Sequence, residues 1–153
     1  MSQEWQRDQY VISTDKERLD RGVIHHFLST SYWAKGIPLE TVQRAIEHSL
    51  TFGLYNGDEQ IGFARVITDY ATFAYLADVF VLKAFRGQGL GKWLLNVIIS
   101  HPNLQGLRRW MLVTRDAHRL YRQSGFTDAK TPERYMERLF PDVYKSTSNS
   151  HGI

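Results

Sequence analysis

Cysteine is absent from the 153 residues of this chain. Its absence excludes disulfide bonds, thiolate metal ligands and cysteine nucleophiles, and it fits a reducing cytoplasm. No run of 18 apolar residues occurs, and the first residues, MSQEWQRDQY, lack a basic region followed by an apolar one. We therefore expect no membrane-spanning helix and no secretory signal, and we predict a soluble, cytoplasmic protein.

The chain also lacks histidines at the spacing that is typical of metal ligands. The six histidines follow no ligand pattern, and the adjacent His25 and His26 would point to different sides of a helix. We therefore expect no metal site.

The composition is that of one folded domain. Hydrophobic residues make up 42% of the chain and aromatic residues 13%, which is enough to build a core at this length. We expect a single domain over residues 1–140, followed by a polar tail over residues 141–153 that frays.

Positive charge is concentrated in one part of the chain. Between Lys83 and Arg122 there are eight Lys or Arg residues and one acid, Asp116, a net charge of +7. Because the whole chain carries +3, the remaining residues carry −4. This distribution suits an anionic ligand in the basic part. A basic surface that contacts only water would give the same pattern.

Hydrophobic periodicity and turn signals predict alternating helices and strands. Strands are expected at residues 10–13, 50–56, 60–68, 71–82 and 109–114, near 126 and at 134–139, and helices at 15–28, 38–49, 90–100 and 117–124. A capping box of Thr14 and Glu17 would begin the first helix, and Asn56-Gly57-Asp58 would close a hairpin. The order of these elements predicts one α/β sheet with both faces covered.

The segment RGQGLGKW, residues 86–93, places three glycines at the start of an amphipathic helix. A helix normally starts with a Ser, Thr, Asp or Asn cap and acids in its first turn, because its free N–H groups favour negative charge. Here Arg86 and Lys92 bring positive charge instead. The pattern predicts that a phosphate group binds the bare N–H groups. The alternative is an uncapped turn whose charges point into water.

The motif Arg86-x-x-Gly89-x-Gly91 resembles the Q/R-x-x-G-x-G/A signature of the GCN5-related N-acetyltransferase (GNAT) superfamily. The strand end VFV at 79–81 and the segment LYRQSGF at 120–126 also resemble elements of that family, and the similar order of elements covers about residues 10–140. The resemblance implies the GNAT fold: a mixed, mostly antiparallel central sheet with helices on both faces. It also implies acetyl-coenzyme A as co-substrate, and transfer of its acetyl group to a primary amine.

The same resemblance implies roles for particular residues. The strand end would pair its main chain with the pantetheine arm of the coenzyme, and the loop would hold its pyrophosphate. The coenzyme-binding residues implied are Val79, Phe80, Val81, Arg86, Gly87, Gln88, Gly89, Leu90, Gly91 and Lys92. Tyr121 matches the tyrosine that protonates the departing thiolate in many members. The alternative is a tyrosine that only packs beside the coenzyme.

Asp78 is an acid inside the apolar strand YLADVFV. Strict alternation places it on one face with Leu76 and Phe80. A carboxylate there is costly unless it is paired or functional, so Asp78 is a candidate general base. An ion pair with an arginine such as Arg65 is the alternative.

The amine acceptor, a small molecule or a peptide, is expected to contact the segment SYWAKG between the first two helices, through Tyr32 and Trp33. These aromatic side chains could equally belong to the core.

Two other functions explain part of the pattern. A non-catalytic acyl-coenzyme A sensor would keep the glycine loop and lack the acid. A nucleic-acid-binding module would use the basic stretch, but it needs exposed aromatic residues among the cations, and most aromatics here fall at core spacing. We therefore expect no nucleic-acid partner, and the sequence leaves a homodimer open.

Overall fold

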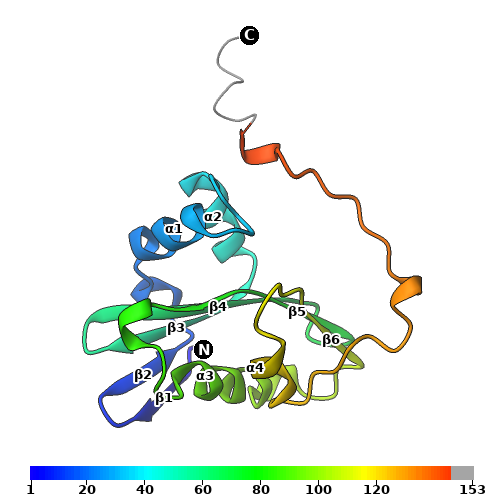
Figure 1. Cartoon of the computed structure of the whole chain (residues 1–153). Helices are drawn as coiled ribbons and strands as arrows, with labels where there is room; N and C mark the ends of the chain where they lie inside the picture. The colour runs from blue at the N-terminus through cyan, green and yellow to red at the C-terminus, as the bar shows by residue number, and fades with distance from the viewer. Residues whose placement is uncertain (146–153) are drawn as a thin grey trace.

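The structure is a computed structural model that describes residues 1–145, with one six-stranded sheet and helices on both of its faces (Figure 1). The strands are β1 (Glu4–Arg7), β2 (Tyr10–Ser13), β3 (Leu50–Asn56), β4 (Glu59–Thr68), β5 (Phe73–Val81) and β6 (Arg109–Met111). The helices are α1 (Arg21–Thr30), α2 (Leu39–Glu47), α3 (Leu90–Ile99) and α4 (His118–Arg122). The strands lie side by side in chain order, antiparallel except for the parallel pair β5 and β6. This mixed, mostly antiparallel sheet confirms the predicted fold class.

The first predicted helix is interrupted. Residues Lys16–Arg18 form a separate 3-10 helix, and α1 starts later because Asp20 caps it by accepting the N–H of Val23 at 3.1 Å. Thr14, the predicted cap, instead accepts the N–H of Gln3 at 2.8 Å. That bond helps to hold β1, a strand that the sequence analysis does not predict.

The chain after β6 is less regular than predicted. β6 ends at Met111, and no strand forms near residue 126 or at 134–139 within the described part of the chain. Local alternation predicts strands at these positions, but a strand also needs a neighbouring edge to pair with. Here the segment leaves the sheet, contains a short 3-10 helix at Pro132–Arg134, and returns toward α1 and α2 (Figure 1). Residues 146–153, most of the tail predicted to fray, lie outside the described residues.

Two apolar clusters cover the two faces of the sheet. On one face, α3 packs through fully buried side chains, each of which contributes about 1.5–3 kcal/mol relative to exposure; these include Leu94, Leu95 and Ile98. On the other face, α1 and α2 pack through Ile24, Leu28, Val42 and Ile46 against Phe63 and Phe80. The carboxyl-terminal half of β5 lies between these two helical layers, and the candidate functional site is at this half of the strand.

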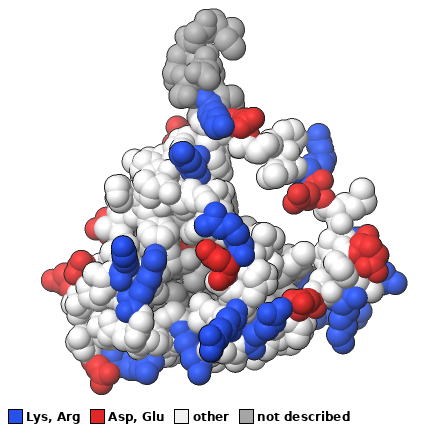
Figure 2. Space-filling view, viewed as in Figure 1, with Lys and Arg blue, Asp and Glu red and all other residues white. Residues whose placement is uncertain are grey.

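Basic side chains gather along the lower edge of the molecule in the view of Figure 2, where α3 and α4 lie in Figure 1. Both helices belong to the basic part of the sequence. Among residues 1–145, no helix has the length and apolar character needed to cross a membrane.

Candidate functional site

The glycine loop, residues 86–92, connects the end of β5 to α3. The Nε–H of Arg86 donates to the main-chain oxygen of Val81 at 2.7 Å and so holds the loop against the strand end. Gly87 and Gly89 have φ angles of 83° and 82°, in the left-handed region that L side chains rarely adopt. Gly89 is the N-cap of α3, so the first turn has no side-chain cap, and it contains no acid. Its N–H groups are therefore available to an anion.

The side chain of Gln88 holds the loop in place. Its Nε2 donates to the main-chain oxygen of Phe85 at 3.1 Å, and its Oε1 accepts the hydroxyl of Tyr10 at 3.2 Å. The amide side chain is thus used within the protein, which leaves the main chain of Gln88 as the group that can meet a ligand.

The second half of β5 has one open edge. Its pairing with β6 covers Phe73–Tyr75 alone, whereas its pairing with β4 continues to Val81. On the β6 side, residues 76–81 therefore face no strand among those of residues 1–145. An extended, amide-rich ligand can add to such an edge as a further strand would. The predicted coenzyme-binding residues Val79, Phe80 and Val81 lie on this stretch.

A β-bulge at Asp78 divides the two halves of β5. Asp78 and Val79 together face Ala64, and Asp78 has a φ of 55°. The extra residue reverses the alternation, so that Leu76 packs on the α3 face and Phe80 on the face of α1 and α2. The expectation that Asp78 shares one face with both residues is therefore wrong, because strict alternation fails across a bulge.

The Asp78 carboxylate lies on the face of α1 and α2 and makes two contacts. Its Oδ2 accepts the Nε–H of Arg65 at 2.8 Å, and the two side chains are only 17% and 11% exposed. Its Oδ1 accepts the indole N–H of Trp33 at 2.8 Å. The ion pair that was the alternative to a catalytic Asp78 is thus present. Each oxygen still has a lone pair with which it can accept another proton.

The segment between α1 and α2 brings the predicted acceptor-binding residues to this carboxylate. Tyr32 and Trp33 pack edge to face with ring centroids 5.1 Å apart, and they are 47% and 42% exposed. A cavity of about 70 Å³ is bordered by Arg65 and Asp78 and by apolar residues of α1 and α2. Trp33 does not line this cavity, but its bond to Asp78 connects the aromatic pair to the cavity wall.

Tyr121 lies on α4 and is buried, with 9% of its surface exposed. Burial, together with the nearby Tyr32 and Asp116, raises the pKa of its phenol to about 12. The hydroxyl therefore keeps its proton at neutral pH, as a proton donor must. The ring also packs against Phe126 at 6.0 Å.

Two residues of the site are not among the sequence candidates. Arg115 places its guanidinium 3.8 Å from the ring centroid of Tyr32, and the main-chain N–H of Arg115 donates to the Tyr32 hydroxyl at 3.1 Å. Ser49 accepts the Nη1–H of Arg65 at 3.1 Å through its hydroxyl oxygen. The Arg115 contact joins residues 83 positions apart, so no local pattern could indicate it, whereas Ser49 and Arg65 lie across the predicted β3–β4 hairpin. Residues 1–145 contain no cluster of three or more His, Asp or Glu side chains that could hold a metal ion.

Comparisons with known proteins agree with this geometry. The family model described as the acetyltransferase (GNAT) family matches residues 16–126. A protein of Gibberella zeae, named as a candidate acetyltransferase, is 37% identical over 142 residues, which cover 78% of this chain and 79% of the relative.

Solved structures give the same result. A crystal structure of a candidate acetyltransferase of the GNAT family from Xanthomonas campestris pv. campestris is 54% identical to this chain, with a TM-score of 0.86. The match covers 88% of this chain and 96% of that one. A GNAT acetyltransferase from Elizabethkingia anophelis, solved with acetyl-CoA bound, shares the fold with a TM-score of 0.63 at 16% identity, over 88% and 90% of the two chains. The chain belongs to the GNAT family of acetyltransferases.

Proposed function

We propose that this protein transfers the acetyl group of acetyl-CoA directly to a primary amine, while both substrates are bound. The observation that carries the proposal is the uncapped start of α3, with its left-handed glycines, next to the unpaired edge of β5. A diphosphate at a helix start and an amide-rich chain along a strand edge are the two features of coenzyme A that such a surface fits. Neighbours that share the fold were solved with acetyl-CoA.

In this proposal the main-chain N–H groups of residues 87–92 bind the diphosphate, and residues 79–81 pair with the pantetheine arm. Arg86 keeps the two segments together through its bond to Val81. The thioester would then lie between the β5 bulge and Tyr121, near the Tyr32–Trp33 pair. The basic part of the chain attracts the coenzyme phosphates to this surface.

The reaction needs a neutral amine, a donor to the oxyanion, and a proton for the leaving thiolate. The amine nitrogen attacks the carbonyl carbon, and a main-chain N–H near Val79 or Phe80 donates to the oxygen as its charge grows. Asp78 takes the amine proton, directly or through a water. As the C–S bond breaks, the Tyr121 phenol gives its proton to the sulfur, and solvent restores that proton.

The experiment that tests this proposal is an amine screen with acetyl-CoA, in which release of free thiol is measured. Polyamines, aminoglycosides, amino acids and peptides represent the acceptor classes. The wild type should acetylate at least one class, and Tyr121→Phe should lower kcat by about 100-fold or more, while calorimetry shows unchanged acetyl-CoA binding. Binding without transfer to any class would favour the non-catalytic sensor instead. The absence of both would overturn the proposal.

A further inference from the structure

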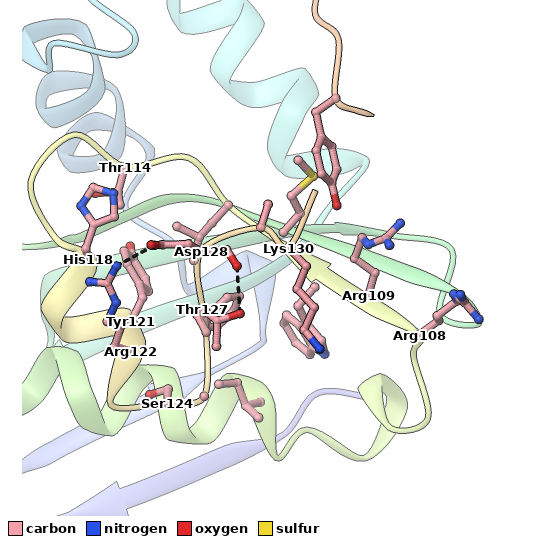
Figure 3. Close-up of a pocket in the computed structure, with 18 of the residues that line it drawn as sticks. Arg108, Arg109, Thr114, His118, Tyr121, Arg122, Ser124, Thr127, Asp128 and Lys130 are labelled. Atoms are coloured by element: carbon pink, nitrogen blue, oxygen red, sulfur yellow. Dashed lines mark hydrogen bonds and ion pairs between the residues drawn. The ribbon is translucent and has the colours of Figure 1, made fainter. Parts of the chain in front are cut away.

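Two cavities border residues of the proposed reaction, and their charges differ. The larger one, of about 740 Å³, lies between residues 108–112 and residues 124–131, with Tyr121 in its wall (Figure 3). Its one described acid, Asp128, is paired with Arg122 at 2.6 Å. The described lining also contains the cations Arg108, Arg109 and Lys130. A protonated amine is repelled from a surface with such an excess of positive charge, so this cavity does not suit the acceptor.

The smaller cavity, of about 70 Å³, lies on the face of the sheet that α1 and α2 cover. Asp78 and Arg65 border it at the bulge of β5. Much of its wall consists of apolar side chains that are no more than 2% exposed: Ile24, Leu28, Val42, Ile46 and Phe63. An amine nitrogen bound at Asp78 therefore places the group next to it against these apolar walls.

The charges of the smaller cavity already balance each other. Among the described residues that line it, Asp78 and Arg65 alone are charged, and they pair at 2.8 Å. Arg65 also donates to the hydroxyl oxygen of Ser49 at 3.1 Å. A second ammonium group would thus meet no free carboxylate in this lining, and a carboxylate would have to displace a bond that Arg65 already makes. Because an unpaired charge is costly between apolar walls, the group that fills the cavity has to be uncharged.

The volume of the cavity limits the size of this group. In another protein, an apolar cavity of about 150 Å³ holds a benzene molecule. The smaller cavity has about 70 Å³. It therefore has room for roughly three or four carbon atoms, and an aromatic ring does not fit. A short alkyl chain satisfies the limits of both size and charge.

Tyr144 closes the cavity from outside the layer of α1 and α2. The other described lining residues belong to these helices, their connection, β4 and β5, whereas Tyr144 lies in the segment that returns to the helices after α4 (Figure 1). Its side chain is half-buried and packs against the apolar cluster. A Cβ added at Gly36 would lie 3.8 Å from the Cβ of Tyr144. A smaller side chain at position 144 should thus enlarge the cavity without removing a fully buried wall.

We propose that the acceptor is a primary monoamine with a short, uncharged alkyl chain, and that Tyr144 limits the size of that chain. This inference rests on the proposed function, because it places the acceptor nitrogen at Asp78. The nitrogen stays at the β5 bulge while the chain fills the cavity. Polyamines and aminoglycosides carry several ammonium groups and do not fit such a site.

Three amines test the charge requirement. Butylamine, putrescine and δ-aminovalerate share one carbon chain and differ at its far end, which carries a hydrogen, an ammonium or a carboxylate. With acetyl-CoA and the wild type, thiol release should give butylamine a kcat/KM at least about tenfold higher than either charged amine. Equal or better transfer to putrescine or δ-aminovalerate would overturn this inference and leave the proposed function standing. No transfer to these amines or to the classes of the amine screen would contradict both.

Tyr144→Ala tests the size limit. The measured quantity is the kcat/KM for benzylamine divided by that for butylamine, and we expect this ratio to rise at least about tenfold in the variant. The ratio compares two substrates on one preparation, so a loss of folded protein does not change it. Tyr144→Phe keeps the ring and should keep the ratio of the wild type. Phe140→Ala is the matched control, because it changes an exposed ring of the same segment that does not line the cavity. An unchanged ratio in Tyr144→Ala, or an equal rise in Phe140→Ala, would overturn the proposal.

Discussion

The indole N–H of Trp33 donates to Oδ1 of Asp78 at 2.8 Å, and so joins the segment between α1 and α2 to the bulge of β5. This hydrogen bond holds together two side chains whose residues are 45 positions apart in the chain. The contact connects the aromatic pair proposed to bind the acceptor with the carboxylate proposed to take its proton. Its removal should affect the amine more than the coenzyme.

Trp33→Phe tests this separation. The variant keeps an aromatic ring and loses the N–H donor. A hydrogen bond to a charged group contributes about 1.5–3 kcal/mol, so we expect the KM for the amine to rise about tenfold or more. The KM for acetyl-CoA should stay unchanged, because the glycine loop is not touched. Steady-state kinetics with the amine found in the screen measure both values, and Trp5→Phe in β1 is the control. An unchanged amine KM would contradict the proposed contact.

Asp78→Asn separates the charge of this side chain from its backbone role. Asn tolerates the left-handed conformation that the φ of 55° requires, and it can still accept from Trp33. We expect kcat to fall by about 100-fold, in the range typical for loss of a general base. Because Arg65 loses its partner, unfolding by urea should show a stability loss of roughly 1–3 kcal/mol. Asp58→Asn, in the exposed turn between β3 and β4, should change neither quantity. A variant with normal kcat would leave Asp78 a structural ion-pair residue.

Gly89→Ala tests the loop without adding a steric clash. A Cβ at this position meets no atom within 4 Å, so the cost arises from the φ of 82° alone and should be about 1 kcal/mol. Relief of this strain shifts the N–H groups at the start of α3, and we expect calorimetry to show acetyl-CoA binding at least about tenfold weaker. Gly57→Ala is a matched control, since Gly57 also has a positive φ of 61° and open space around it. Both variants should lose similar stability, and equal coenzyme affinity in the two would refute the role of the loop.

The parts of the fold that could be predicted from the sequence are those in which short-range pattern and final packing agree. The amphipathic face of α3 and the hairpin of β3 and β4 depend on spacing that the local sequence contains. The split of the first helix could not be predicted, because the side chains of Thr14 and Asp20 can both cap a helix. In the structure Asp20 caps α1, and Thr14 instead accepts the N–H of Gln3, the residue before β1.

The candidate site follows the same division. The glycine loop could be recognised because glycines and missing acids at a helix start have a direct physical meaning. The orientation of the Asp78 side chain could not be predicted, because it depends on a bulge that arises from the way β5 pairs with β4. The strand predicted at 134–139 has a suitable pattern, but pairing needs an edge, and its own chain carries it away from β6.

Tyr55 gives a prediction about alkaline stability. Its side chain is 1% exposed in β3, and within the described part of the chain its hydroxyl has no hydrogen-bond partner. Burial raises the pKa of this phenol to about 12, partly opposed by Arg18. Below pH 10 the folded and unfolded chains both keep the proton, so the full stability is present there. Between pH 10 and 12 the unfolded chain loses the proton while the folded chain keeps it, and stability falls as the pH rises, by about 2–3 kcal/mol for this residue.

Tyr55→Phe should therefore unfold less readily than the wild type at pH 11–12. At pH 7 its free energy of unfolding should be equal or up to about 1 kcal/mol higher, because an unpartnered buried hydroxyl is removed. Tyr121 titrates in the same direction, so part of the alkaline loss should remain in the variant. Urea unfolding at pH 7 and pH 11 measures the difference, with the exposed Tyr70→Phe as control. If Tyr55→Phe lost as much stability as the wild type between these pH values, the Tyr55 phenol would not be the group whose burial makes the fold sensitive to alkali.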